Sequence, residues 1–307
     1  MDTRFLESFV MVIEHGSVAA AARRLNLTDA AVTQRVRALE REIGTKLIGR
    51  SGRTVRATEA GAAILMHAKS LLRGVKDLRS VATEELFSGE LNLGAISSAL
   101  TGILPALLAG VAAKYPLLKL FITPGSSEDL YQKTTSGELD AAVIVEPQVE
   151  LPKTCDWTVW REEPFVVLAP RRTKETSAHR LLETQPFIRY DRNTLGGRLA
   201  ERYLQKVKIR PQDRYELDSL EAIAVLVDRG LGVSLVPDWA PPWPEGLNLR
   251  KIPLPQAFEC RRIGLLWRRS SPRIRLVQAL AMSASAVVSG VVRGARSSPQ
   301  RRVVFTN

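Results

Sequence analysis

Side chains that can hydrogen bond to nucleic-acid bases and phosphates recur at helical spacing between residues 28 and 41. Gln34, Arg37 and Arg41 are separated by three and then four positions, so a helix would place all three on one face. An amide can bind adenine through two hydrogen bonds, and a guanidinium group can do the same with guanine or a phosphate. We therefore expect this segment to contact double-stranded DNA. The candidate contact residues are Ser17, Thr28, Asp29, Ala30, Thr33, Gln34, Arg35, Arg37 and Arg41.

Two short helices joined by a tight turn must position this polar face. Ser17 is a suitable N-cap for a helix over residues 19–24, and Thr28 is one for a second helix after a turn at Asn26. The second helix has an apolar stripe formed by Val32, Val36, Leu39 and Ile43. This pattern predicts a helix-turn-helix whose second helix is the recognition helix. The alternative is an ordinary helical hairpin with a solvated basic face.

The segment that follows the recognition helix, residues 45–58, contains four basic residues and no acid. It is typical of two short strands around Ser51-Gly52, which would form a hairpin with a basic tip, a wing. Its arginines would lie along DNA phosphates, which position a protein without reading sequence. The alternative is a solvated charged loop. The arginines are Arg50, Arg53 and Arg56.

A long helix is predicted over residues 59–86, because its apolar residues alternate in steps of four and three. These residues are Ile64, Ala68, Leu71, Val75, Leu78 and Ala82. One narrow apolar stripe on so long a helix favours pairing with the same helix of a second subunit, through Ile64, Leu71, Val75 and Leu78. Packing of the helix on the chain's own domain is the alternative.

From residue 89 the pattern changes to alternating strands and helices, which predicts a parallel α/β sheet. We expect two similar lobes joined by two crossings. Two local expectations are a helix that begins at Thr101, and a turn at Gly196-Gly197 before a helix over residues 198–206. The predicted domains are 1–58 (winged helix-turn-helix), 59–88 (linker and dimerisation helix), 89–292 (two lobes, about 89–162 with 268–292, and about 163–267) and 293–307 (a basic tail without periodicity).

A cleft between two such lobes, at the carboxyl ends of the strands, is a common ligand site. Helix starts and hydroxyl groups at this place favour an anion, so we expect a small, anionic effector. Each hydroxyl group taken alone could equally be a helix cap. The candidate effector-binding residues are Ser97, Ser98, Thr101, Ser126, Ser127, Asn193, Thr194 and Val233.

Composition supports a nucleic-acid partner and gives little support to catalysis. The chain of 307 residues has a net charge of +12 and a pI near 10.1, which favours a polyanionic partner or an acidic surface. Its three histidines lie in unrelated segments, and it has no phosphate-binding loop or dinucleotide fingerprint. We expect no enzyme activity, no cofactor and no metal site. Two cysteines are too few for a disulfide scaffold, and no signal sequence or membrane span is evident, so we expect a cytoplasmic protein.

Residues 5–61 closely resemble the LysR-type transcriptional regulators, and residues 89–292 resemble the effector-binding domain of that family. The first resemblance is carried by Phe5, Phe9, Gly16-Ser17, Ala21-Ala22, Leu25, Val32-Thr33, Leu39-Glu40, Gly44, Leu47, Arg50, Thr58 and Gly61. The second is carried by Leu104-Pro105, Tyr115-Pro116, residues 137–140 and residues 230–233.

The resemblance implies an α/β protein overall, with a winged helix-turn-helix, a linker helix and a two-lobed domain like periplasmic binding proteins. It also implies a homodimer or dimer of dimers on promoter DNA, and a small molecule that alters DNA bending and contact with RNA polymerase. Thr28-Asp29-Ala30 departs from the family's usual Ser-Gln motif, and Asp29 could accept a hydrogen bond from cytosine. The rival interpretation is a two-lobed solute-binding protein, which would have no use for residues 1–86.

Overall fold

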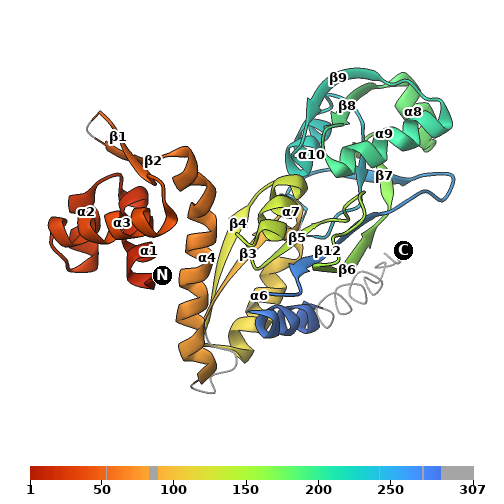
Figure 1. Cartoon of the computed structure of the whole chain (residues 1–307). Coiled ribbons are helices and arrows are strands. Elements are labelled where there is room, and N and C mark those ends of the chain that lie inside the picture. Colours follow the sequence, from red (N-terminus) through yellow and green to blue (C-terminus); the bar gives the residue numbers. More distant parts are fainter. Residues whose placement is uncertain (53, 83–88, 242, 272, 285–307) are drawn as a thin grey trace. The chain divides into compact units, whose positions relative to one another are not determined.

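The computed structural model describes residues 1–307 apart from 53, 83–88, 242, 272 and 285–307; the side chains of 51, 73 and 76–82 are also outside the description. The predicted basic tail and residues 285–292 of the predicted two-lobed domain therefore lie outside the described residues. The chain separates into two compact units, the first from Met1 to Gly89 and the second beginning at Glu90 (Figure 1). Each unit is described by itself.

The first unit is a winged helix-turn-helix followed by a long helix, as predicted. Its elements are α1 (Thr3–His15), α2 (Val18–Leu25), α3 (Asp29–Ile43), β1 (Ile48–Ser51), β2 (Thr54–Ala57) and α4 (Glu59–Ala82). Ser17 and Thr28 cap α2 and α3 through their hydroxyl groups, and Asn26 forms the turn in the left-handed conformation with φ of 53°. Gly16 and Gly44 end α1 and α3 in the same conformation. The caps thus fix both ends of the recognition helix.

The apolar stripe of α4 divides between two environments. Ala68 is buried in the core of the first unit, and Ile64 packs against that core. Lys69 on the same helix forms an ion pair of 2.8 Å with Glu14 of α1. Leu71 and Val75, in contrast, are 52% and 41% exposed. The first half of the predicted seam therefore packs on the chain's own domain, and the next turns leave an apolar surface uncovered within this unit. The side chain of Leu78 lies outside the described residues.

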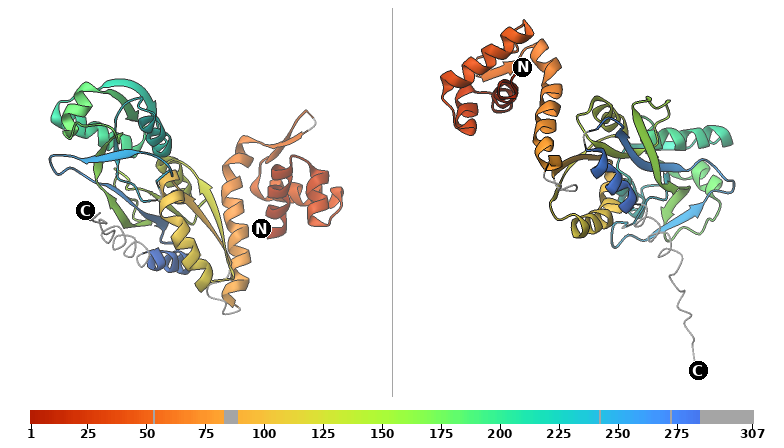
Figure 2. Two further views of the ribbon diagram at one scale, coloured as in Figure 1. Left: turned by 180° about the vertical axis from the view of Figure 1, so that it is seen from behind. Right: turned by 60° about the horizontal axis from the view of Figure 1, so that its bottom comes forward.

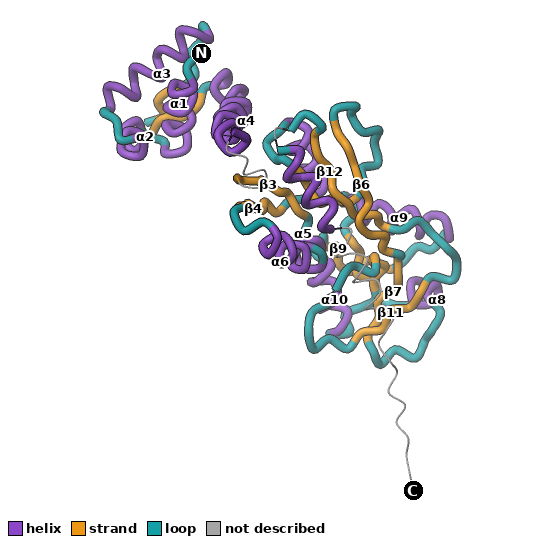
Figure 3. Tube along the Cα trace, turned by 90° about the horizontal axis from the view of Figure 1, so that it is seen from below, coloured by secondary structure: helices purple, strands orange, loops and turns teal. Residues whose placement is uncertain are grey.

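The first lobe of the second unit is built on a five-stranded sheet in the order β4-β3-β5-β12-β6. Its strands are β3 (Gly89–Ala95), β4 (Leu118–Pro124), β5 (Ala141–Val145), β6 (Cys155–Glu163) and β12 (Arg261–Arg268). Its helices are α5 (Ser97–Gly102), α6 (Leu104–Lys114), α7 (Ser127–Ser136) and a helix over residues 274–284. β3 and β5 are parallel, but β12 runs antiparallel to both β5 and β6. Figure 3 shows β6 and β12 side by side. The sheet is mixed rather than purely parallel, and β6 was not expected from the sequence.

The second lobe contains a three-stranded sheet in the order β10-β7-β11 and a parallel pair, β8-β9. Its strands are β7 (Phe165–Pro170), β8 (Pro186–Tyr190), β9 (Gln212–Leu217), β10 (Ser234–Pro237) and β11 (Leu249–Pro253). Its helices are α8 (Ala178–Thr184), α9 (Leu195–Val207) and α10 (Leu220–Asp228). A single bridge between Phe187 and Val233 joins the two sets of strands. Figure 2 shows these residues, coloured green to light blue, gathered in one lobe.

The polypeptide crosses between the two lobes at two places. β6 leads directly into β7, and the segment after β11 leads into β12, whose first residue is Arg261. Because β12 pairs with β5 and β6 along its whole length, the second crossing precedes Arg261, and the expected limit of the second lobe at residue 267 is too late.

Two local predictions are wrong. The helix expected from Thr101 begins earlier, and it is divided into α5 and α6 at Ile103, so Thr101 lies inside a helix and caps nothing. Gly196 and Gly197 form the first turn of α9 rather than a separate turn. A Cβ atom at Gly196 would lie 2.6 Å from a ring carbon of Tyr190, and one at Gly197 would overlap the Asp191 carbonyl. Glycine is needed here because the helix start approaches the preceding strand closely.

Among the helices of the described residues, none combines the length and the apolar character needed to cross a membrane.

Candidate nucleic-acid interface and ligand cavity

The outward face of α3 presents polar groups that are free to bind a partner. Gln34, Arg37 and Arg41 are exposed, and their side chains form no hydrogen bond or ion pair within the described residues. Together with Asp29, Ala30 and the start of the following loop they line a shallow open groove. Thr33 donates a hydrogen bond to the Asp29 carbonyl (2.8 Å), and Arg35 is only half-exposed. The structure therefore brings the predicted α3 residues other than Arg35 to one groove, where the amide of Gln34 and the guanidinium groups of Arg37 and Arg41 are exposed.

The hairpin β1–β2 carries two further exposed arginines. Arg50 and Arg56 lie on adjacent strands, opposite Val55 and Gly49 respectively. The hairpin is fixed to the helices by a hydrogen bond of 2.8 Å from the Val55 amide to the Gly16 carbonyl. The predicted Arg53 lies outside the described residues.

Glu40 joins the recognition helix to the hairpin, a role the sequence did not assign to it. Its carboxylate is only 7% exposed and accepts hydrogen bonds from the backbone amides of Leu47 (2.9 Å) and Ile48 (3.3 Å). The ammonium group of Lys46 lies 3.1 Å away. Burial acts to raise the pKa of Glu40, but these donors outweigh it and lower the pKa overall. The only sequence signal was its place in the Leu39-Glu40 pair of the family pattern.

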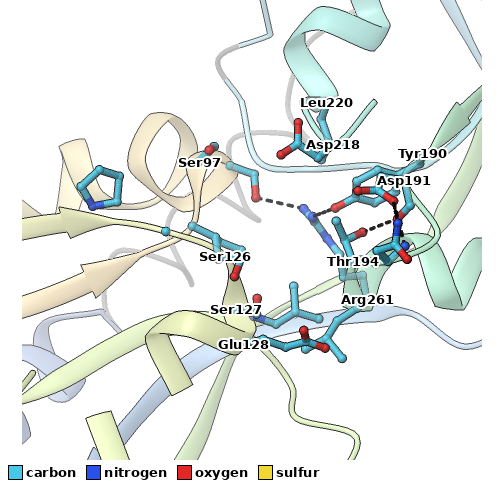
Figure 4. Close-up of a pocket in the computed structure, with 18 of the residues that line it drawn as sticks. Ser97, Ser126, Ser127, Glu128, Tyr190, Asp191, Thr194, Asp218, Leu220 and Arg261 are labelled. Carbon is cyan, nitrogen blue, oxygen red and sulfur yellow. Dashed lines mark hydrogen bonds between the residues drawn. The ribbon is translucent and has the colours of Figure 1, made fainter. Parts of the chain in front are cut away.

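A cavity of about 590 Å³ lies between the two lobes of the second unit (Figure 4). Its walls come from the carboxyl ends of β3, β4 and β5 in the first lobe and of β8 and β9 in the second. This is the position predicted for a ligand, since the ends of neighbouring strands and the helix starts that follow them meet there. The lining residues used below are Ser97, Ser98, Glu128, Tyr190, Asp191, Asp218, Glu221 and Arg261.

Most of the predicted effector-binding residues line this cavity. They are Ser97, Ser98, Ser126, Ser127, Asn193 and Thr194. The other two do not line it. Thr101 is exposed on α5, where its hydroxyl group contacts the Ser97 carbonyl (3.4 Å) and the Glu221 carboxylate (3.3 Å). Val233 is 2% exposed and packs in the core of the second lobe.

Several of the cavity hydroxyl groups already have structural partners. Ser126 and Thr194 cap α7 and α9, accepting from amides at 3.2 and 3.0 Å. Ser127 accepts from the Val145 amide (3.1 Å), and Asn193 donates to Asp191 (2.9 Å). Ser97 is exposed and its hydroxyl group is free of contacts in the described part of the chain. Each of these groups could therefore act as a structural partner of the backbone or as a ligand donor, and these are the two alternatives that the sequence left open.

The wall of the cavity also contains a buried ion pair, which the sequence gave no means to predict. Arg261, at the start of β12, and Glu163, at the end of β6, are each 1% exposed, and their closest charged atoms are 2.5 Å apart. Arg261 also donates to Ser98 (3.2 Å) and to Tyr190 (3.3 Å). Burial acts to lower the pKa of Arg261, but the charge of Glu163 and the interactions with Tyr190 raise it overall. The partners come from both lobes and from both crossings, far apart in the sequence, so no local pattern marks them.

The other charged groups of the cavity are acids. Glu128 is paired with Arg198, at 2.6 Å. Asp191, Asp218 and Glu221 have no ion-pair partner within the described residues. Asp191 accepts from the amide groups of Asn193, and among the described residues Glu221 accepts from the hydroxyl groups of Thr101 and Ser219 alone.

Metal ligands and cysteines were also candidates for chemistry, and the structure describes the surroundings of both. No cluster of three or more potential metal ligands occurs in the part of the chain that the structure describes. Cys155 is buried, and burial together with the nearby Glu162 raises the pKa of Cys260, which disfavours the reactive thiolate.

A winged helix-turn-helix joined to a two-lobed α/β unit with an interlobe cavity defines the class of ligand-responsive DNA-binding regulators. Residues 3–62 match the model of the bacterial regulatory helix-turn-helix proteins of the lysR family. Residues 84–287 match the model of the LysR substrate binding domain. The chain belongs to the LysR family of transcriptional regulators. It is thus a sequence-specific DNA-binding regulator with a domain for a small-molecule effector.

Individual relatives agree with this assignment. The chain is 30% identical over 242 residues to the HTH-type transcriptional regulator CzcR of Bacillus cereus, covering 78% of this chain and 81% of the relative. It is 28% identical to the transcriptional activator IlvY of Salmonella typhimurium, covering 78% and 83%. Among solved structures, a cysteine variant of full-length OxyR from Pseudomonas aeruginosa superposes with a TM-score of 0.69 at 25% identity, covering 92% of this chain and 94% of that one. CbnR in complex with its target DNA has the same fold, with a TM-score of 0.64 at 21% identity, covering 92% and 100%.

Proposed function

We propose that α3 enters the major groove of promoter DNA and reads base edges through Gln34 and Arg37, while Arg50 and Arg56 of the hairpin contact phosphates. The exposed, unpaired guanidinium and amide groups on one surface of the first unit support this assignment most directly. Asp29 begins α3 and is exposed on the same groove, where it can accept a hydrogen bond from the amino group of cytosine. Helix starts of this kind approach base edges in helix-turn-helix proteins.

The protein pairs with a second copy of itself, in this proposal, through the exposed apolar surface of α4 at Leu71 and Val75, and it works as a dimer or a dimer of dimers. Two copies would bring two recognition helices to an inverted repeat in the operator. The complex acts on RNA polymerase at the promoter, in the cytoplasm. The supporting observation is that these side chains are uncovered although the same helix buries Ala68 one turn earlier.

The effector occupies the interlobe cavity in this proposal, in contact with Ser97, Ser98 and the ends of β8 and β9. Both lobes contribute walls, so a bound molecule can stabilise one relative position of the lobes over another. This change would alter the affinity of the protein for DNA. The cavity of about 590 Å³ is within the range of small-molecule sites.

Selected DNA provides the test of the DNA-binding assignment. The full-length protein would select its preferred sequences from a random library, and variants would then be compared on the selected site and on a scrambled site. Gln34→Ala should reduce the preference between the two, by about 1–3 kcal/mol per lost base contact. Arg56→Ala should weaken both equally and lower the salt dependence by about one unit.

Arg229→Ala is the matched control, since Arg229 is exposed in the second unit and forms no ion pair within the described residues. It should change neither property. A Gln34→Ala variant with unchanged preference, or an Arg56→Ala variant that alters preference, would contradict the roles assigned here.

A further inference from the structure

The wall of the interlobe cavity offers hydrogen-bond donors that have no acceptor of their own. Ser98, Tyr190 and Arg261 are 5%, 7% and 1% exposed, and all three line the cavity. The Ser98 and Tyr190 oxygens accept from Arg261, and neither hydroxyl proton has an acceptor within the described residues. A guanidinium group has five N–H bonds, and the contacts of Arg261 with Glu163, Ser98 and Tyr190 use four. Buried donors without acceptors are costly, so a ligand with acceptor atoms at this wall would satisfy them.

These donors do not make the wall a site of net positive charge. Glu163 pairs with Arg261, and both groups are buried away from solvent. Glu163 also pairs with Arg161 at 3.2 Å, but Arg161 does not line the cavity. The wall is therefore suited to hydrogen bonding with an acceptor such as a carboxylate, but none of the described residues that line the cavity is an unpaired cation that could offset repulsion elsewhere in it.

The second lobe supplies such repulsion. Asp191, Asp218 and Glu221 lie at the ends of β8 and β9 and at the start of α10, and all three line the cavity without a basic partner in the described chain. Figure 4 shows Asp218 and Asp191 on the side of the cavity formed by the second lobe. A purely anionic ligand would meet three uncompensated carboxylates there. A purely cationic ligand would leave the donors of Ser98, Tyr190 and Arg261 unsatisfied.

We propose that the effector is an aminocarboxylate, a small zwitterion whose carboxylate accepts hydrogen bonds from Ser98, Tyr190 and Arg261 and whose ammonium group lies against Asp218 and Glu221. This proposal rests on the proposed function of the cavity, and it replaces the anionic effector expected from the sequence. That expectation used the hydroxyl groups and helix starts, which are present, but it did not include the acids of the second lobe.

Binding to the full-length protein would be measured by thermal shift and calorimetry with the twenty standard amino acids. Each amino acid that binds would be compared with its N-acetyl derivative, which lacks the positive charge, and with its C-terminal amide, which lacks the negative charge. We expect at least one amino acid to bind, and both derivatives to bind at least tenfold more weakly. An N-acetyl derivative that binds as tightly as its parent, or the failure of all twenty amino acids to bind, would overturn the proposal.

Substitutions in the cavity assign the two charges to their partners. Asp218→Asn and Glu221→Gln should each weaken binding of the amino acid by roughly fivefold, as for the loss of a partly exposed charge pair. Tyr190→Phe should weaken binding of the amino acid but not its discrimination against the N-acetyl derivative. Glu183→Gln is the control, because Glu183 is an exposed acid of the same lobe outside the cavity. An equal effect of Glu183→Gln would overturn the assignment.

A panel of mono- and dicarboxylic acids without an amine separates this inference from the function on which it rests. Asn193→Trp would fill the cavity from its exposed edge. If a carboxylic acid binds better than every amino acid and Asn193→Trp abolishes its binding, the cavity is an effector site and the zwitterion proposal is wrong. If Asn193→Trp leaves all binding unchanged, the cavity is not the effector site and both proposals fail.

Discussion

Replacement of Glu40 by alanine should loosen the hairpin from the recognition helix while leaving the helices folded. The Glu40 carboxylate is the acceptor for the Leu47 and Ile48 amides, and it pairs with Lys46. Leu47 is fully buried, so its amide cannot turn to water when the carboxylate is removed. The substitution therefore leaves at least one buried donor unsatisfied at the start of β1.

The expected loss follows from these contacts. An unsatisfied buried donor costs about 1–3 kcal/mol, and the Ile48 amide and the mostly exposed Lys46 add less. A total of about 2–3 kcal/mol corresponds to a loss of roughly 30- to 150-fold in the equilibrium that protects these amides from opening. Glu40→Gln keeps an acceptor oxygen but no charge, and it should cost about 1 kcal/mol.

Hydrogen exchange followed by mass spectrometry on the full-length protein would measure this opening directly. Peptides that contain Leu47 and Ile48 should exchange faster in Glu40→Ala, while peptides of α1 and α2 keep their protection. The control is Glu42→Ala, since Glu42 is an exposed acid on the same helix, and its only ion pair with a described residue is a 3.8 Å contact with the N-terminus. Unchanged protection in Glu40→Ala, or an equal loss in Glu42→Ala, would refute the reasoning.

Four further outcomes are expected from the same structure. Gly61→Ala should destabilise the first unit by about 2 kcal/mol or more in chemical denaturation, because its Cβ atom would overlap the backbone carbonyl that precedes the hairpin. Leu71→Asp should shift sedimentation toward smaller species and weaken operator binding, whereas an unchanged size would exclude this surface from assembly. The folded-state pKa of Glu40 is lowered, so its contribution is complete at neutral pH and should be lost as the pH falls below about 4, seen as faster exchange of the hairpin amides in acid. Arg261→Met should lower the melting temperature of the second unit by the equivalent of about 1–3 kcal/mol, because the buried Glu163 would lose its shorter ion pair and keep only Arg161 and the Ala240 amide, and an unaltered melting temperature would contradict this.

Local signals in the sequence were sufficient for the first unit. Ser17, Thr28, Gly16 and Gly44 are caps whose chemistry acts over a few residues, and the apolar periodicity of the helices is equally local. The heptad pattern of α4 did not distinguish its buried part from its exposed part, because Ala68 and Leu71 both lie on the same apolar seam. Which of them is buried depends on where α1 lies.

In the second unit, local signals were not sufficient, because long-range contacts decide the placement of several elements. β6 and β12 have no alternation that distinguishes a strand of the first lobe from one of the second, since pairing between strands decides their place. The glycines at 196 and 197 are usual turn residues, and only the approach of α9 to Tyr190 explains their position in a helix. The pair of Arg261 and Glu163 spans 98 residues, so its members could not be joined from the sequence alone.

The central claim, that this chain is a regulator that reads DNA sequence through its first unit, is tested most directly by one ratio. The full-length protein would be titrated against its selected DNA and against a scrambled duplex of equal length, at a fixed salt concentration. The structure and its family predict binding to the selected site at least about 10³-fold tighter, the lower limit for specific DNA-binding proteins. Equal affinity for the two duplexes would contradict the claim and leave only the general attraction of a basic protein for a polyanion.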